Sequence, residues 1–414
     1  MYNYKNNNLD DESMECIFYD NNIKYMYIKT YLETLKKIKN KELVKEIKIY
    51  YLLPNMDKFI NLKKLICSYY EYDLGKFPDL SKLVKLQYLN CKNCNLTVLP
   101  GLSNLTNLEY LDFSQNNLIE VPDLSNLTKL EYLNCNNNNL TELPNLSNCI
   151  NLGYLNCSNN ELTDLQNIST CINLEYLNCN FNSLKKLSDL SNLVNLEILY
   201  CNFNKLTKLT GLDKLIKLEL LYCSNNKLTE LLSLYNLFHL NNLSCDNNLL
   251  TKLPYLPINR LKILTCRNNL LLNLNEISEC NTLESIVCSN NKLSKLPDLS
   301  KLINLEYLCC YNNNLTDLSA LNNNNNLYIL NCINNKLTEL PDLYNTNLMI
   351  FKFYNNKLKK LPISITKYKY LKHYKKYTEY KNINKLTYLL NITISNYYYL
   401  HIMNYYKKIH ILIK

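Results

Sequence analysis

The feature that most constrains this chain is a leucine that recurs at a step of 22 residues, with two steps shortened to 21. Self-similarity at a period of roughly 20 to 50 residues is typical of a solenoid, in which each unit buries its apolar face only against its neighbours. The period therefore predicts a stacked repeat with an extended surface and no catalytic pocket. The recurring leucines are Leu86, Leu108, Leu130, Leu152, Leu174, Leu196, Leu218, Leu240, Leu261, Leu283, Leu305, Leu327 and Leu348.

One repeat, LEYLNCNNNNLTELPNLSNCIN at 130–151, shows what each unit contains, with positions numbered from its first leucine. Its start alternates as a short strand does, so Leu133 and Cys135 are predicted to face inward and Tyr132 and Asn134 outward. Successive repeats should place these strands side by side in a parallel sheet. A unit of this length leaves no room for a long helix, so the return path should consist of turns or single 3₁₀ turns.

Position nine is Asn in twelve of the thirteen units from Leu86 onward, and Cys94 is the exception. An Asn buried at the end of a strand can bond the free backbone groups of adjacent coils. The column therefore predicts a structural ladder of asparagines and not a ligand site.

The pattern LxxLxCxxNxLxxLPxL, which covers residues 62–362 in fourteen units, resembles the leucine-rich repeat. Its 22-residue length is similar to that of internalins and of the phosphatase-regulatory repeat proteins. The resemblance implies an α/β leucine-rich repeat solenoid, a curved horseshoe or superhelix. In that fold a parallel β-sheet lines the concave face, and turns or short 3₁₀ segments form the convex face. The resemblance specifies no single function, because this family binds proteins, peptides, lipids and nucleic acids on one scaffold.

Cysteine is unusually frequent, with 18 residues, and position six explains most of them. Phe113 and Phe353 occupy that position in two units, which indicates apolar core. A straight row of thiols suits neither disulfide geometry nor a tetrahedral zinc site, so we expect free thiols, no metal and a reducing compartment. Cys309, at outward position five, is predicted to face solvent. The position-six cysteines are Cys67, Cys91, Cys135, Cys157, Cys179, Cys201, Cys223, Cys245, Cys266, Cys288, Cys310 and Cys332.

Outward positions two, three and five are predicted to line the concave face, with a stripe of Tyr beside an acidic rail of Glu. Tyr is favoured in binding surfaces because it combines a large rigid contact area with a polar tip. Cross-strand Tyr stacking also stabilises a sheet by itself, and the chain holds 36 Tyr in all, so a purely structural role stays open. The candidate partner-binding residues are Tyr88, Tyr110, Tyr132, Tyr154, Tyr176, Tyr200, Tyr222, Tyr307, Glu109, Glu131, Glu175 and Glu197.

The net charge of +10 is concentrated at the C-terminus, where residues 363–414 carry ten Lys against the single acid Glu379. This Lys- and Tyr-rich segment is interpreted as a cap or solvated tail, with attachment to nucleic acid or an acidic membrane as the alternative. On the repeats, the acidic rail disfavours nucleic acid. The N-terminal segment, residues 1–61, is predicted to hold a cap helix at about 28–40 and a degenerate first coil at 43–53.

No catalytic constellation or cofactor motif occurs in the sequence, and His239 is the only His in the repeats. We therefore predict a non-enzymatic scaffold that binds a basic or amphipathic protein partner on its concave face and needs no cofactor. An adaptor that recruits ubiquitination machinery through its N-terminal segment is a competing hypothesis. The sequence makes no prediction about oligomeric state.

The location of the protein is predicted from what its sequence lacks. No run of about 18 apolar residues occurs, and the N-terminus, MYNYKNNNLDDE, is polar and acidic where a signal peptide is basic and then apolar. We expect no membrane span and an intracellular, cytoplasmic protein. Abundant Asn, Lys, Ile, Leu and Tyr follow codons rich in A and T, which indicates an AT-rich genome such as that of a large DNA virus or a protist.

Overall fold

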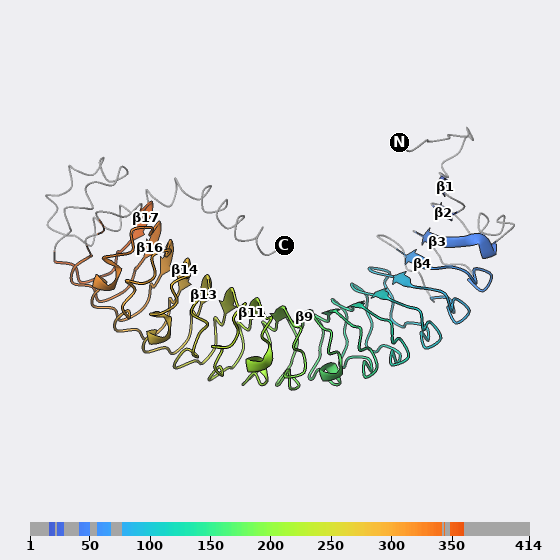
Figure 1. Ribbon diagram of the computed structural model, residues 1–414, viewed down its shortest axis with the longest axis horizontal. Coiled ribbons are helices and arrows are strands. Elements are labelled where there is room, and N and C mark those ends of the chain that lie inside the picture. The colour runs from blue at the N-terminus through green and yellow to red at the C-terminus, as the bar shows by residue number, and fades with distance from the viewer. Residues whose placement is uncertain are drawn as a thin grey trace. The chain divides into compact units, whose positions relative to one another are not determined.

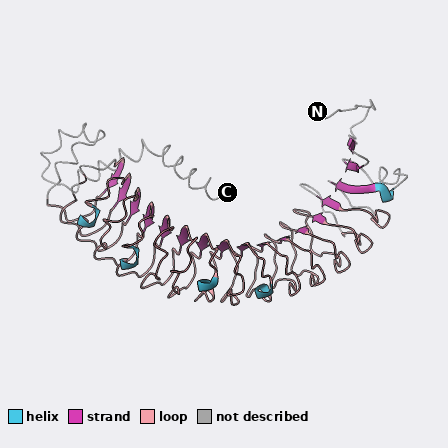
Figure 2. Cartoon of the chain, in the orientation of Figure 1, coloured by secondary structure: helices cyan, strands magenta, loops and turns pink. Residues whose placement is uncertain are grey.

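The computed structural model describes residues 16–20, 23–28, 41–49, 56–67, 77–341, 343 and 348–359. The chain divides into two compact units, Met1–Asn204 and Lys205–Lys414. Each unit is a stack of coils in which short strands follow one side and turns follow the other (Figures 1 and 2). The side formed by the strand positions two, three and five of each coil is called the strand face below.

In the first unit, β1 (Cys16–Asp20) and β2 (Ile23–Ile28) form an antiparallel pair, and β2 pairs in parallel with β3 (Val44–Ile49). From β3 onward each strand pairs in parallel with the next, so that equivalent residues of successive coils lie side by side. The remaining strands are β4 (Lys64–Cys67), β5 (Tyr88–Asn90), β6 (Tyr110–Asp112), β7 (Tyr132–Asn134), β8 (Tyr154–Asn156), β9 (Tyr176–Asn178) and β10 (Ile198–Tyr200). Single 3₁₀ turns occur at Lys41–Leu43 and Ile168–Thr170.

The second unit continues the same plan, with seven strands that pair in parallel from one coil to the next. They are β11 (Leu220–Tyr222), β12 (Asn242–Ser244), β13 (Ile263–Thr265), β14 (Ser285–Val287), β15 (Tyr307–Cys309), β16 (Ile329–Asn331) and β17 (Ile350–Lys352). Single 3₁₀ turns occur at Leu212–Lys214, Asn275–Ile277 and Ser319–Leu321. The predicted class, a leucine-rich repeat solenoid with a parallel sheet on one side and short turns on the other, is confirmed.

The core of each coil consists of the leucines and the position-six residue that the periodicity singles out. In the coil 130–151, Leu130, Leu133, Cys135 and Leu140 are all fully buried. Burying one such leucine contributes about 1.5–3 kcal/mol. Leucine recurs at positions one and eleven of every coil from Leu86 onward. Stacking therefore supplies the apolar burial that one coil alone could not provide.

The seventeen cysteines from Cys67 to Cys332 are all buried thiols, and for the position-six cysteines this burial confirms the core interpretation. One prediction is wrong: Cys309 does not face solvent, because only 4% of its surface is exposed. It pairs with Val287 on the preceding strand and with Asn331 on the following strand, so a neighbouring residue lies on each side of it. Position five is thus shielded by its neighbours even though it points away from the core.

The asparagine column forms the predicted ladder. Asn138 Nδ2 donates to the carbonyl oxygens of Cys135 in its own coil and Phe113 in the preceding coil, both at 3.1 Å. Its Oδ1 accepts the backbone N–H of Leu118 at 3.1 Å. Each such Asn therefore satisfies backbone groups of two coils at once, which is what buried polar groups require.

Position eight lies one residue before position nine, where the asparagine ladder runs. At position eight the backbone adopts a left-handed conformation and leaves the strand direction. Asn137 has φ 52° and Asn159 has φ 54°. Asn tolerates this region better than most residues because its short polar side group bonds locally. Asn occupies position eight in ten of the thirteen coils from Leu86 onward, so a residue that tolerates this turn follows most of the three-residue strands.

Several terminal predictions fall outside the part of the protein that the structure describes. Residues 29–40 of the predicted cap helix and the whole tail 363–414 lie there, while Ile28 ends the strand β2. The pairing of β1 with β2 has no counterpart in the sequence analysis. Among the described residues, no helix is long and apolar enough to cross a membrane.

Candidate functional site

Five tyrosines at position three form one continuous stack on the strand face of the first unit. Their rings are nearly parallel, with interplanar angles of 6° or 7°. The ring centroids are 4.0–4.3 Å apart, because the in-register parallel strands place equivalent side chains directly beside one another. The stacked residues are Tyr88, Tyr110, Tyr132, Tyr154 and Tyr176.

Both ends of this stack are covered. The Lys64 Nζ lies 5.1 Å from the ring centroid of Tyr88, within cation–π distance. At the other end, Tyr200 meets Tyr176 edge-on, with centroids 5.8 Å apart and an interplanar angle of 78°. The ring faces are therefore used within the protein, and the stack offers a partner its ring edges and hydroxyl groups.

Four of the stacked tyrosines, from Tyr110 to Tyr176, have a hydroxyl pKa that is raised above its ordinary value. Burial raises the pKa of Tyr154 and of Tyr176 to about 12, and charge repulsion by the neighbouring phenol adds to the shift. Burial also raises the pKa of Tyr110 and Tyr132. The stack therefore presents neutral hydroxyls that can donate hydrogen bonds.

The neighbouring row at position five is already used inside the protein. Asp112 is 4% exposed and accepts hydrogen bonds from the Ser114 backbone N–H at 2.9 Å and hydroxyl at 2.6 Å. Asn134 donates to Asp112 at 3.3 Å, and Asn156 accepts the Ser158 hydroxyl at 2.8 Å. The side chains of this row form hydrogen bonds with groups at the ends of the strands. Positions two and three are therefore the ones whose polar groups remain for a partner.

The acidic rail at position two runs beside the tyrosines. Glu131, Glu175 and Glu197 are exposed, and Glu109 is half-buried and accepts a hydrogen bond from Gln87 at 3.0 Å. None of the four takes part in an ion pair with the described residues. Positions two, three and five of the coils from Gln87 to Tyr200 carry no Lys or Arg, so this surface is acidic.

Ten of the twelve candidate residues therefore lie together on the first unit. The other two, Tyr222 and Tyr307, belong to the second unit and stand apart from the stack. The Tyr222 hydroxyl accepts a hydrogen bond from Asn242 at 3.2 Å, and Tyr307 pairs with Ser285 and Ile329 on the adjacent strands. A binding role for any of the twelve stays a prediction.

One aromatic pair was missed by the sequence analysis. Phe181 and Phe203 stack with centroids 4.3 Å apart while remaining 48% and 46% exposed. Both sit at position eight with φ 54° and 53°, a conformation that is strained for a bulky residue. The signal was present in the sequence, because every other coil from Leu86 onward has Asn or Gln at this position.

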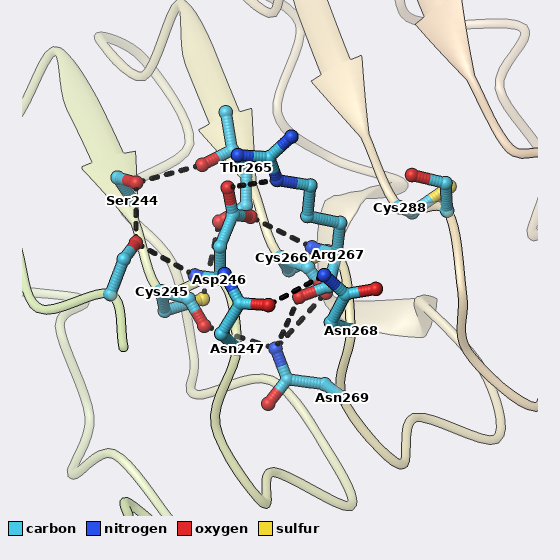
Figure 3. A network of polar contacts seen from close by, with 12 residues as sticks. Ser244, Cys245, Asp246, Asn247, Thr265, Cys266, Arg267, Asn268, Asn269 and Cys288 are labelled. Carbon is cyan, nitrogen blue, oxygen red and sulfur yellow. Dashed lines mark hydrogen bonds and ion pairs between the residues drawn. The ribbon is translucent and has the colours of Figure 1, made fainter. Parts of the chain in front are cut away.

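A polar network on the second unit was missed as well (Figure 3). Asp246 is buried, and its Oδ2 accepts a hydrogen bond from Arg267 Nε at 2.8 Å. Both residues occupy position seven of consecutive coils, so opposite charges at one position could have revealed the pair. Among the described residues, no group of three or more His, Cys, Asp or Glu could hold a metal ion.

Comparison with known proteins agrees with this architecture. A family model described as Leucine Rich repeats (2 copies) matches residues 84–127, 128–170 and 172–214. The structure of a leucine-rich repeat protein from Leptospira interrogans is 28% identical, with a TM-score of 0.63, and the match covers 81% of this protein and 97% of that one. No curated protein sequence gives a significant match.

Two further solved structures are similar at higher identity. The functional domain of InlJ from Listeria monocytogenes, which includes a cysteine ladder, is 34% identical with a TM-score of 0.59, over 70% of this protein and 68% of that one. YopM, a leucine-rich effector protein from Yersinia pestis, is 32% identical with a TM-score of 0.56, and the match covers 70% of this protein and 84% of that one. The repeat columns, the asparagine ladder and these matches together show that the chain belongs to the leucine-rich repeat proteins.

Proposed function

We propose that this protein is a non-enzymatic scaffold whose first unit binds a protein partner on its strand face. Leucine-rich repeat proteins generally act in protein–protein interaction. The observation that carries the proposal is the acidic rail, where four glutamates without an ion-pair partner among the described residues flank a stack of half-buried tyrosines. Exposed charges of one sign on a rigid sheet favour a partner of the opposite sign.

The chemistry of the surface narrows the kind of partner. The ring faces of the stack are occupied, so flat ligands such as nucleic-acid bases find no free stacking platform between Tyr88 and Tyr176. The acidic rail would also repel phosphates. Hydroxyl donors beside carboxylates suit a protein segment that offers Lys or Arg side chains and free backbone carbonyls. A basic or amphipathic segment is the partner that we propose.

Two alternatives receive less support. Recruitment of ubiquitination machinery would depend on residues 1–61, and attachment to nucleic acid or acidic membranes would depend on the tail 363–414. Neither the comparisons nor the described residues offer a feature in their favour. The free, buried thiols support our proposal of a reducing intracellular compartment, since disulfides form and persist in oxidising ones.

The proposal is tested by quantitative capture of partners with matched charge variants. The first variant replaces all four glutamates of the acidic rail with glutamine, and these changes are Glu109→Gln, Glu131→Gln, Glu175→Gln and Glu197→Gln. The control variant changes four exposed glutamates at position thirteen on the turn side, and these are Glu120, Glu142, Glu230 and Glu339→Gln. Both variants change the net charge equally, so only the position of the change differs.

We expect a partner captured by the natural protein to be lost, at least tenfold, by the rail variant and to be retained by the control. A truncated protein ending at Leu361 should still capture it. Equal capture by the two variants would contradict the proposal. So would capture that needs the tail and disappears with nuclease or salt, because that result would assign binding to residues 363–414.

A further inference from the structure

We propose that Arg267, on the strand side of the second unit, is a receptor for a single carboxylate group of a protein partner. This inference goes beyond the proposed function, because it concerns a different unit and a ligand of opposite charge. It is carried by the way in which Asp246 holds the Arg267 guanidinium (Figure 3).

Asp246 fixes Arg267 through both carboxylate oxygens. Its Oδ1 accepts the Arg267 backbone N–H, and its Oδ2 accepts Nε, each at 2.8 Å. The Asp246 side chain is 8% exposed, whereas that of Arg267 is 49% exposed. Among the described residues, Nη1 and Nη2 have no hydrogen-bond acceptor. The guanidinium is thus anchored through Nε on a half-exposed side chain, and its two Nη groups remain as a pair of donors for a ligand.

The anchor itself is held in place by a series of hydroxyl groups. The backbone N–H of Asp246 donates to Ser224 Oγ at 2.9 Å, and Ser224 Oγ lies 2.8 Å from Ser244 Oγ. Thr265 Oγ1 donates to Ser244 Oγ at 2.9 Å (Figure 3). Three neighbouring coils therefore contribute to the position of one arginine. Such preorganisation lowers the entropic cost of ordering the receptor when a ligand binds.

The composition of the protein shows that an arginine at this position is unusual. Of the 46 basic residues, only Arg260 and Arg267 are arginine, and the other 44 are lysine. A lysine could bond Asp246, but it could not at the same time present a planar pair of donors to a second acceptor. Arg260, by contrast, is exposed in a turn. The general preference of this sequence for lysine therefore does not explain the arginine at position 267.

The local charge favours one carboxylate over a phosphate dianion. Asp246 already neutralises Arg267, and on the same coil and the next one Lys262 and Glu284 pair with each other at 2.9 Å. No surplus of positive charge is available to balance a dianion. The two outer N–H groups match the two oxygens of one carboxylate, the bidentate geometry that arginine recognises. The C-terminus of a polypeptide and the side chain of an Asp or Glu residue both supply this group.

The proposal is tested by NMR of the arginine Nε–Hε groups in the full-length protein. Only two such signals exist, and Arg260→Lys assigns them, so Arg260 serves as an internal control. The probes are N-acetyl-alanyl-alanine, its C-terminal amide, N-acetyl-aspartate amide and methyl phosphate. The first probe presents a C-terminal carboxylate and the third an acidic side chain, so their relative affinities distinguish the two sources.

We expect at least one of the two carboxylate probes to shift the Arg267 signal in a saturable manner and to leave Arg260 unchanged. The amide probe should bind at least tenfold more weakly. Equal responses of the two arginines, equal binding of the amide, or no saturable shift with either carboxylate would overturn the proposal. A tenfold preference for methyl phosphate would also overturn it, because the site would then recognise phosphate.

Discussion

The rings of Tyr132 and Tyr154 lie parallel within 7°, with their centroids 4.3 Å apart. Each ring in the middle of the stack has a neighbour of this kind on both faces, so the five tyrosines stabilise one another as well as the sheet beneath them. The structural and the binding interpretation of the stripe are therefore compatible. Stacking holds the rings upright, and their edges and hydroxyls remain for a partner.

The contribution of the stack to stability follows from this geometry. Tyr132→Ala removes two stacked contacts at once and should lower the free energy of unfolding by about 1–3 kcal/mol. Tyr132→Phe keeps the ring and should change it by less than about 0.5 kcal/mol. Urea denaturation of the two variants and the natural protein gives both values. Equal losses from Ala and Phe would show that the hydroxyl, and not ring stacking, provides the stability.

Substitutions in the asparagine ladder should lower the free energy of unfolding by more than substitutions in the tyrosine stack. Asn138→Ala leaves the buried Leu118 N–H without a partner and removes one of the two Asn donors from the carbonyl oxygens of Phe113 and Cys135, which should cost about 2–4 kcal/mol. Its neighbour Asn139 is exposed and provides a matched control, since Asn139→Ala should cost less than about 0.5 kcal/mol. Both values are measured by chemical denaturation. Similar costs at the two positions would refute the ladder as a source of stability.

Most of this fold is encoded in local, periodic signals that can be recognised in the sequence. Leu130, Cys135 and Asn138 each belong to a column that recurs coil after coil, so the buried face, the strand and the ladder were all predictable from spacing and polarity. The stacking of Tyr110 on Tyr132 follows in turn, because in-register parallel strands place equivalent side chains beside one another.

Features that depend on particular neighbours were not predictable in the same way. Cys309 follows the outward alternation, yet it is buried between the neighbouring strands that carry Val287 and Asn331. The contact between Asp246 and Arg267 joins residues 21 apart in sequence and needs the particular side chains of adjacent coils. Such departures from the repeat occur at single positions, so periodicity alone does not reveal what they contact. They nevertheless distinguish this protein from a regular repeat.

The buried thiols should make the protein sensitive to alkali. Burial raises the pKa of Cys157 and of Cys223 from the ordinary value of 9.0 to about 12. Below pH 9 both the folded and the unfolded protein keep these protons, so their stabilising effect is fully present there. Between pH 9 and pH 12 the unfolded protein loses protons that the folded protein retains, so the free energy of unfolding falls as the pH rises.

At pH 10 each such thiol should lower the free energy of unfolding by about 1.4 kcal/mol relative to pH 8. Urea denaturation under reducing conditions at the two pH values measures the total. The variant Cys157→Ala, which lacks one of these thiols, should show a smaller difference between them. A free energy of unfolding that is the same at pH 8 and pH 10 would contradict the assignment of these cysteines to the core.

The central claim, that the strand face of the first unit binds the partner, is tested most directly by photocrosslinking from two positions of one coil. Glu131 is exposed on the strand face and Glu142 is exposed on the turn side of the same repeat. A photoreactive p-benzoylphenylalanine at position 131 should crosslink the partner, and one at position 142 should not. Crosslinking from position 142 alone would place the working surface on the turn side and contradict the account.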